Sequence, residues 1–443
     1  MSRRAAVRAL LAGAASAVAL GLIASPATAT TTIATTAAGA SGAPLSATAP
    51  AVRLATAGGC TDTAALIPQR PPALARLQAS TAWEQSRGAG IVVAVVDSGV
   101  DAANPHLADV LAGGTDLVGD GAGAAGYADG YGHGTAIAGQ IAARAVDGSG
   151  VEGLAPDARI LSVRVFAGTD DQAVAAGAGP SIARLAAGIR FAADANAQII
   201  NVSLSTAVDD PALREAVAYA TAHGSLLVAS AGNRDSSLAV EKDQKDGVRY
   251  PAGYPGVLGV AAVGTGGTVT DDSIHGAHVA LSAPGQDVLT AASTGGDCVY
   301  ASDAPATSFA TAYVSASAAL VASAHPDETP AEWAYRLTAS AIRAHPGSRD
   351  DAAGWGVVQP YEAVVLVPGA ETAGPPNPFT AATRRPVAAA SGAVTVHAND
   401  DSRARQSTAA VVVSVVGLTA LAAVAAISVL AARRRRTRRD GTA

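Results

Sequence analysis

Apolar segments of two kinds alternate along the chain between Gly90 and about Val367. Short runs, mostly of β-branched residues, have the length of strands, and longer segments repeat their apolar residues at helical spacing. The predicted strands are Ile91–Val96, Ala158–Phe166, Gln198–Leu204, Ser225–Ser230, Val257–Val263 and His278–Leu281. The predicted helices are Ala136–Ala145, Ser181–Ala195, Pro211–Ala222, Ser308–Ala324 and Thr329–Ala341. Apolar strands separated by helices predict an α/β domain with a mostly parallel sheet covered on both faces.

The N-terminal segment has the pattern of an export signal. Arg3, Arg4 and Arg8 precede the apolar segment Ala9–Ile23, and small residues follow as far as Ala29. This order predicts a secretory signal peptide at residues 1–29, with an uncleaved N-terminal anchor as the alternative. The twin arginines match a Tat signal only weakly, so Sec and Tat export both stay open.

A second membrane signal lies near the C-terminus. Thr408–Ala432 contains 25 residues without a charge. As a helix it would be roughly 37 Å long, enough to cross a hydrocarbon core of about 30 Å. Six arginines follow between Arg433 and Arg439, and positive charge stays on the cytoplasmic side. We therefore predict one transmembrane helix at 408–432, a cytoplasmic tail at 433–443, and the bulk of the chain outside the plasma membrane. The alternative is a buried helix of a soluble protein.

Composition divides the rest of the chain. Residues 30–81 are rich in Ala and Thr and then in Pro, and we expect them to form an N-terminal extension along the surface of the main domain. The main domain is predicted at 82–367. Residues 368–407 are rich in Pro, Ala, Gly and Thr and cannot bury much apolar surface, so they are predicted to be a linker.

Charge and cysteine content narrow the possible partners. Without the arginines of the signal and tail and without Asp440, 21 basic residues face 35 acidic ones. This excess of acid argues against nucleic acid as a partner. Two cysteines, Cys60 and Cys298, fit an oxidising compartment and predict one disulfide, with two free thiols as the alternative. No cysteine or carboxylate cluster indicates a metal site, and no cofactor is expected.

Candidate reactive residues follow the predicted strands, where ligands of open parallel sheets bind. Asp97 ends the first strand, Asn233 follows the fourth, His133 lies between glycines in GHGT, and Ser308 opens the longest apolar helix. Each alone has an ordinary interpretation, as a turn former, a surface histidine or a helix cap. Together, the order Asp, His, Ser is one that serine hydrolases use for a catalytic triad.

The flanking sequences resemble those of one family. VVDSGV, GHGT, NVSLS, ASAGN and ATSFA resemble, in sequence and order, the blocks of subtilisin-like serine proteases, and the resemblance covers about Ala82 to Val367. It implies a subtilisin-like three-layer fold. It also implies that Asp97 orients His133, that His133 takes the hydroxyl proton of Ser308, and that Ser308 attacks a peptide carbonyl.

The same resemblance implies the rest of an active site. The side-chain amide of Asn233 and the backbone N–H of Ser308 would stabilise the oxyanion. Two strand segments of this chain would pair with the substrate backbone. The first is Ser203, Leu204 and Ser205, and the second is Ser230, Ala231 and Gly232.

A narrower resemblance concerns the whole architecture. VVDSGVDAANPHL, YPAGYPGVLGVAAVG, LSAPGQDV and GWGVVQPYEAV are similar to the mycosins, which are membrane-anchored subtilisin-like proteases of actinobacterial type VII secretion. Mycosins share the signal peptide, extension, linker and C-terminal helix predicted above. The resemblance implies a serine endopeptidase that acts on proteins or peptides and serves a type VII membrane complex. Two alternatives stay open: a weak or inactive structural subunit of that complex, and a general cell-surface protease.

Some positions depart from the family pattern. The family usually has Gly at positions 306, 316 and 205 and Pro at 312, where this chain has Ala306, Ala316, Ser205 and Ala312. If the backbone at 306 requires a positive φ, alanine costs about 1 kcal/mol there. We therefore expect Ala306 to slow catalysis.

Overall fold

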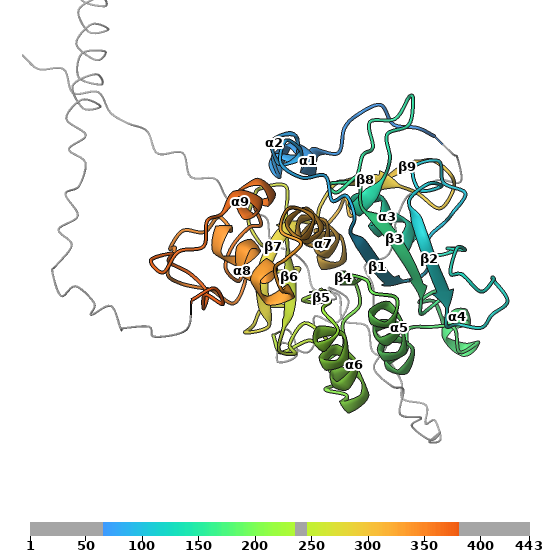
Figure 1. Cartoon of the computed structure of the whole chain (residues 1–443). Helices are drawn as coiled ribbons and strands as arrows, with labels where there is room; N and C mark the ends of the chain where they lie inside the picture. The colour runs from blue at the N-terminus through green and yellow to red at the C-terminus, as the bar shows by residue number, and fades with distance from the viewer. Residues whose placement is uncertain (1–64, 235–245, 381–443) are drawn as a thin grey trace, which may run out of the picture. The chain divides into compact units, whose positions relative to one another are not determined.

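The computed structural model describes residues 65–234 and 246–380 (Figure 1). The predicted signal peptide, transmembrane helix and cytoplasmic tail lie outside the described residues, as do Cys60 and most of the predicted linker. These expectations therefore stay predictions.

The six strands and five helices predicted for the main domain form, with small shifts at their ends, and further elements that the sequence did not predict form beside them. The strands are β1 (Val92–Asp97), β2 (Leu111–Asp116), β3 (Arg159–Arg164), β4 (Ile199–Val202), β5 (Leu226–Ser230), β6 (Val257–Val263), β7 (Val279–Pro284), β8 (Val288–Ala291) and β9 (Asp297–Tyr300). The helices are α1 (Pro72–Arg76), α2 (Ala79–Trp83), α3 (His133–Ala142), α4 (Asp171–Ala175), α5 (Ile182–Asp194), α6 (Pro211–Ala222), α7 (Thr307–Ala324), α8 (Pro330–Ser340) and α9 (Pro360–Val365).

A parallel seven-stranded sheet is the centre of the domain. Its order is β2-β3-β1-β4-β5-β6-β7, and β8 and β9 form a separate antiparallel pair. The chain leaves β1 towards β2 and β3 on one side and returns to β4 on the other. In open α/β sheets, ligands bind at such a switch in strand order. Asp97 therefore ends its strand at the place where the topology favours a site.

Helices cover both faces of the sheet, which makes a three-layer α/β fold (Figure 1). Side chains alternate along β1: Val93 and Val95 belong to the core with α3 and α7, whereas Ala94 and Val96 belong to the core with α5 and α6. A strand buried on both faces needs apolar residues at every position. This requirement explains why the run at β1 is apolar throughout, and it confirms the predicted fold class.

Helix α7 passes through the larger core. Among the described residues it is the one helix long and apolar enough to cross a membrane, but 89% of its 18 residues are buried inside the fold. It is a core helix, and its burial holds Ser308 at a fixed place at the start of the helix.

The N-terminal extension contacts the main domain through backbone groups and through apolar side chains such as Leu74 and Leu77, which are buried in the larger core. The Ile67 N–H donates to Asp297 Oδ2 at 2.7 Å, and the Gly150 N–H donates to the Ile67 carbonyl at 2.7 Å. Asp297 also accepts from His106 Nε2 and from the Ser149 hydroxyl, at 2.9 and 2.6 Å. A fully buried carboxylate thus joins the extension to β9.

The start of the predicted linker contacts α8. The Phe379 ring lies 5.9 Å from the Tyr335 ring, centroid to centroid, and the Arg336 guanidinium lies 5.6 Å from the Phe379 centroid. The chain beyond Val367 therefore follows the domain surface as far as the described residues extend.

Candidate active site

Asp97 and His133 meet at the carboxyl end of the sheet. The His133 Nδ1 lies 2.8 Å from Asp97 Oδ1, and both side chains are fully buried. Because the carboxylate accepts the Nδ1 proton, the second ring nitrogen, Nε2, is the one left to accept a proton from another group. His133 is also the first residue of α3, so the helix fixes its backbone.

Three atoms of the predicted triad are buried without a hydrogen-bond partner in the described part of the chain: Asp97 Oδ2, His133 Nε2 and Ser308 Oγ. Buried polar atoms in folded proteins nearly always have a partner, so unpaired ones mark strain or function. Catalytic hydrogen bonds are often loose in free enzymes and tighten when substrate binds. Transfer of a proton from Ser308 to His133 during attack on a carbonyl stays a prediction, since no hydrogen bond joins the two side chains in the described part of the chain.

Two aromatic rings frame His133, and sequence reasoning missed both roles. The Phe309 ring lies 5.4 Å and the Tyr131 ring 6.4 Å from the His133 ring, centroid to centroid. Phe309 directly follows Ser308, so this contact brings the start of α7 to the imidazole. Phe309 adjoins Ser308 and Tyr131 lies two residues before His133, but closeness in sequence does not show on which side a ring lies.

The side chain of Asn233, the predicted oxyanion donor, contacts the start of α7. Its side-chain oxygen accepts from the Thr307 N–H at 2.9 Å and from Thr307 Oγ1 at 3.0 Å. Thr307 is in turn 2.6 Å from the Ser230 hydroxyl. These bonds orient the carboxamide and leave its nitrogen as a donor for an oxyanion. The backbone N–H of Ser308 lies in the first helical turn, where amides lack partners within the helix.

The structure removes the reason for expecting strain at Ala306. Its backbone has φ −122° and ψ 132°, an extended conformation that any residue adopts. The side chain is buried in the core with α7. The expectation of slow catalysis rested on a positive φ, and that condition is not met, so we no longer expect Ala306 to hinder the site.

The two predicted substrate strands end beside each other. A Cβ built on Gly232 would lie 3.2 Å from Ser205 Oγ, and Gly232 has φ +95°, which favours glycine. The Ser203 hydroxyl turns inward and donates to the Ser308 carbonyl at 3.2 Å. The Ser203 side chain therefore holds the backbone of Ser308, the predicted nucleophile. The backbones of the two segments are the parts suited to pairing with an extended peptide.

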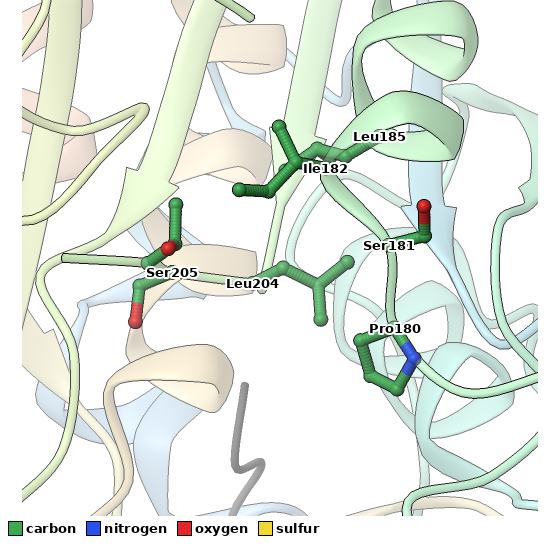
Figure 2. A pocket seen from close by; sticks show the side chains of 7 residues that line it. Pro180, Ser181, Ile182, Leu185, Leu204 and Ser205 are labelled. Carbon is green, nitrogen blue, oxygen red and sulfur yellow. The ribbon is translucent and has the colours of Figure 1, made fainter. Parts of the chain in front are cut away.

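An apolar pocket adjoins the Leu204–Ser205 segment (Figure 2). It is partly open to solvent. It is lined by Pro180, Ser181, Ile182, Leu185, Leu204, Ser205 and Thr206. Leu204 and Leu185 are both buried, and the figure shows the side chains of Leu204 and Ile182 on facing sides of the pocket. A peptide along this segment could place an apolar side chain here.

Of the two cysteines of the predicted disulfide, only Cys298 lies within the described residues. Cys298 lies in β9, next to Asp297, which contacts the extension. Cys60 lies outside the described range, five residues before its first residue, Ala65. Pairing of Cys60 with Cys298 stays a prediction, and it agrees with the path of the extension beside β9.

Comparison with known proteins gives consistent matches. The model of the subtilase family, Peptidase_S8, matches residues 88–356. Thermitase of Thermoactinomyces vulgaris is 36% identical over 248 residues, which cover 56% of this chain and 80% of that protein. Mycosin-3 of Mycobacterium tuberculosis is 34% identical over 323 residues, which cover 63% of this chain and 68% of that protein. The crystal structure of MycP1 from the ESX-1 type VII secretion system is similar with a TM-score of 0.59 and 32% identity, covering 69% of this chain and 88% of that one.

Proposed function

The chain belongs to the subtilase family of serine proteases, and from this we propose that it is a membrane-anchored endopeptidase of a type VII secretion system. The observation that carries the proposal is its similarity to mycosins, found both with mycosin-3 and with the MycP1 structure from the ESX-1 system. The subtilisin-like α/β fold and the protease family were both predicted from the sequence, and the comparisons confirm them, whereas the transmembrane helix stays a prediction.

The proposed chemistry is acyl transfer to Ser308. His133 would take the hydroxyl proton while Ser308 attacks the peptide carbonyl, and would later donate it to the leaving amine. Asp97 would hold the imidazole in the tautomer that leaves Nε2 free. Asn233 and the Ser308 N–H would stabilise the oxyanion, and water would then release the acyl group. Proteins or peptides in extended conformation are the substrates that the two strand segments suit.

The proposed location is the outer face of the plasma membrane. The predicted signal peptide would export the chain, and the predicted helix at 408–432 would stop in the membrane with its arginines inside. The predicted linker at 368–407 would connect the protease domain to that helix.

Protease added to intact cells should digest the catalytic domain and spare an epitope placed after Arg439. The reason is that the arginines after Ala432 hold the tail on the cytoplasmic side. Immunoblotting of both parts before and after treatment measures this. As a control, detergent should make the epitope digestible as well. A catalytic domain that resists digestion in intact cells but is cut after lysis would contradict the proposed orientation.

Two chromosomal changes test the role in secretion. Deleting the gene should stop export of the proteins that the type VII system carries. Replacing Ser308 by alanine should leave at least one exported or cell-envelope protein at its uncleaved mass, because the proposed role is cleavage. Proteomics of culture filtrate and envelope, with mapping of protein termini, measures both effects.

The outcomes of this test separate the alternatives. Loss of export on deletion, without any uncleaved protein in the Ser308→Ala strain, would make the chain a structural subunit of the complex. Unchanged export in both strains would instead favour a general cell-surface protease.

A further inference from the structure

Asp129 is a buried carboxylate that the mechanism above does not use. It lies four residues before His133 and is 6% exposed. Asp129 Oδ1 accepts from the Gly132 N–H at 2.8 Å, and Asp129 Oδ2 accepts from the Thr135 N–H at 2.8 Å and from Thr135 Oγ1 at 2.6 Å. Burial raises the pKa of Asp129 against these hydrogen bonds, which lower it. Burying a carboxylate costs folding free energy, so a carboxylate buried this close to His133 in the sequence indicates a role.

Gly132 and Thr135, which give these three hydrogen bonds, belong to the start of α3, and the Ser98 side chain, in the loop after Asp97, also hydrogen-bonds to Asp129. Gly132 precedes His133, and Thr135 follows it by two residues. The carboxylate thus binds the chain on both sides of His133, within the first turn of its helix, where backbone N–H groups have no intrahelical partner. The position of the imidazole therefore depends on this carboxylate through the backbone.

Thr135 extends the contact to the loop after Asp97. Its hydroxyl donates to Asp129 and accepts from the Asp101 N–H at 2.9 Å. A parallel connection lies beside it, because the Gly134 N–H donates to the Ser98 hydroxyl at 2.9 Å. Both connections join α3, which bears His133, to the loop that begins at Asp97.

The contact between these two segments leaves no spare room. A Cβ built on Gly134 would lie 2.1 Å from the Gly99 carbonyl oxygen and 3.2 Å from Asp97 Cβ. The separation of α3 from the Asp97 loop is therefore set by direct backbone contact and by the hydrogen bonds across it. A small change in these bonds alters how His133 meets Asp97.

We propose that Asp129 is a positioning residue of this protease, which sets the Asp97–His133 geometry by joining the first turn of α3 to the Asp97 loop through Thr135. It touches neither the substrate nor the reacting atoms. No hydrogen bond in the described ranges connects Asp129 to the substrate segments at 203–205 and 230–232. Its loss should therefore act on kcat and leave KM unchanged. The inference rests on the proposed peptidase activity for its assay.

The test is Asp129→Asn in the full chain, assayed with a peptide substrate. Active-site titration with a fluorophosphonate counts the competent molecules. An amide keeps one acceptor oxygen but turns an N–H towards donors that need an acceptor. We expect kcat per titrated site to fall roughly 10- to 100-fold, as for a displaced catalytic group, with KM within about twofold. Normalising to titrated sites removes the effect of partial unfolding, which a merely structural role would produce.

Two variants of Thr135 extend the test to the connection itself. Thr135→Val removes the hydroxyl that links Asp129 to Asp101 and should lower kcat per titrated site, whereas Thr135→Ser keeps the hydroxyl and should restore it. Because both residues act through one connection, Asp129→Asn and Thr135→Val together should cost no more than the larger single loss. If Asp129→Asn does not fold, the two Thr135 variants decide the question.

Asp297→Asn is the matched control. Asp297 is also a buried carboxylate with several donors, but its partners are Ile67, Ser149 and His106. The Asp297→Asn protein should lose stability and keep its kcat per titrated site. Unchanged kcat per site in Asp129→Asn, or an unaffected Thr135→Val, would overturn the inference. Failure of the wild type to titrate would instead refute the proposed function.

Discussion

Ser308→Ala should abolish fluorophosphonate labelling and lower kcat for a peptide substrate by about 10⁶-fold. The expected loss is large because the hydroxyl forms the covalent bond, and no neighbouring group replaces it. Ser308 Oγ is buried without a hydrogen-bond partner among the described residues, at the start of a helix whose next residue contacts His133. Labelling followed on a gel, together with peptide turnover, measures both effects.

The substitution should leave the fold intact, which makes the loss interpretable. Ser308 lies in the first turn of α7, and alanine is a better helix former than serine. Ser317→Ala is the matched control, since Ser317 is equally buried in α7 and donates only to the Tyr313 carbonyl in its own helix. It should retain labelling and turnover. A labelled Ser308→Ala protein would place the nucleophile elsewhere. A folded wild type that does not label would favour an inactive subunit.

The sequence predicted the central elements because their signals are local. The run that became β1 is apolar at every position, as a doubly covered strand must be, and Asp97 is the polar residue that ends it. Asp210 caps α6 by accepting from the Ala212 and Leu213 N–H groups, as its place before Pro211 indicates. Such features depend on a few neighbouring residues, so a single sequence reveals them.

Elements with weak local patterns were not predicted. Strand β2 reads LAGGTD, in which two glycines and a terminal aspartate lower the strand signal, and it forms through its pairing with β3. The hairpin of β8 and β9 covers only a few residues on each side. Neighbouring strands, rather than intrinsic preference, stabilise these segments.

The supporting residues of the site were missed for a different reason. Asp129 lies among glycines, where an aspartate usually forms a turn, and nothing in DGYGHGT shows that its carboxylate is buried. The sequence shows Thr307 only as the residue before Ser308, although its N–H donates to Asn233, 74 positions away in the chain. Contacts between distant segments need the fold before they can be recognised.

The oxyanion donor can be tested apart from the nucleophile. Asn233→Ala should lower kcat by about 10²- to 10³-fold, the cost of removing one oxyanion donor, with little change in KM. KM should hold because the donor acts on charge that develops in the transition state. Labelling should persist, because Ser308 and His133 remain, but its rate should fall.

Alanine at 233 removes two functions at once, and a second variant separates them. The Asn233 oxygen accepts from Thr307, next to Ser308, while its nitrogen is the predicted oxyanion donor. Asn233→Asp keeps the shape and the acceptor for Thr307 but replaces the donor by a negative oxygen. If the nitrogen is the catalytic group, Asn233→Asp should lose at least as much kcat as Asn233→Ala, since it adds repulsion of the oxyanion.

The contrary result has an equally clear meaning. If Asn233→Asp retains wild-type kcat while Asn233→Ala loses it, Asn233 acts only by holding Thr307 and the start of α7, and the oxyanion must be bound by backbone N–H groups alone. Ala306→Gly controls for disturbance at this turn. Because Ala306 has an ordinary extended backbone, its replacement should change kcat by less than about threefold, within the roughly 0.5 kcal/mol typical of a substitution without strain or lost contacts. A larger gain would restore the view that its methyl group hinders the site.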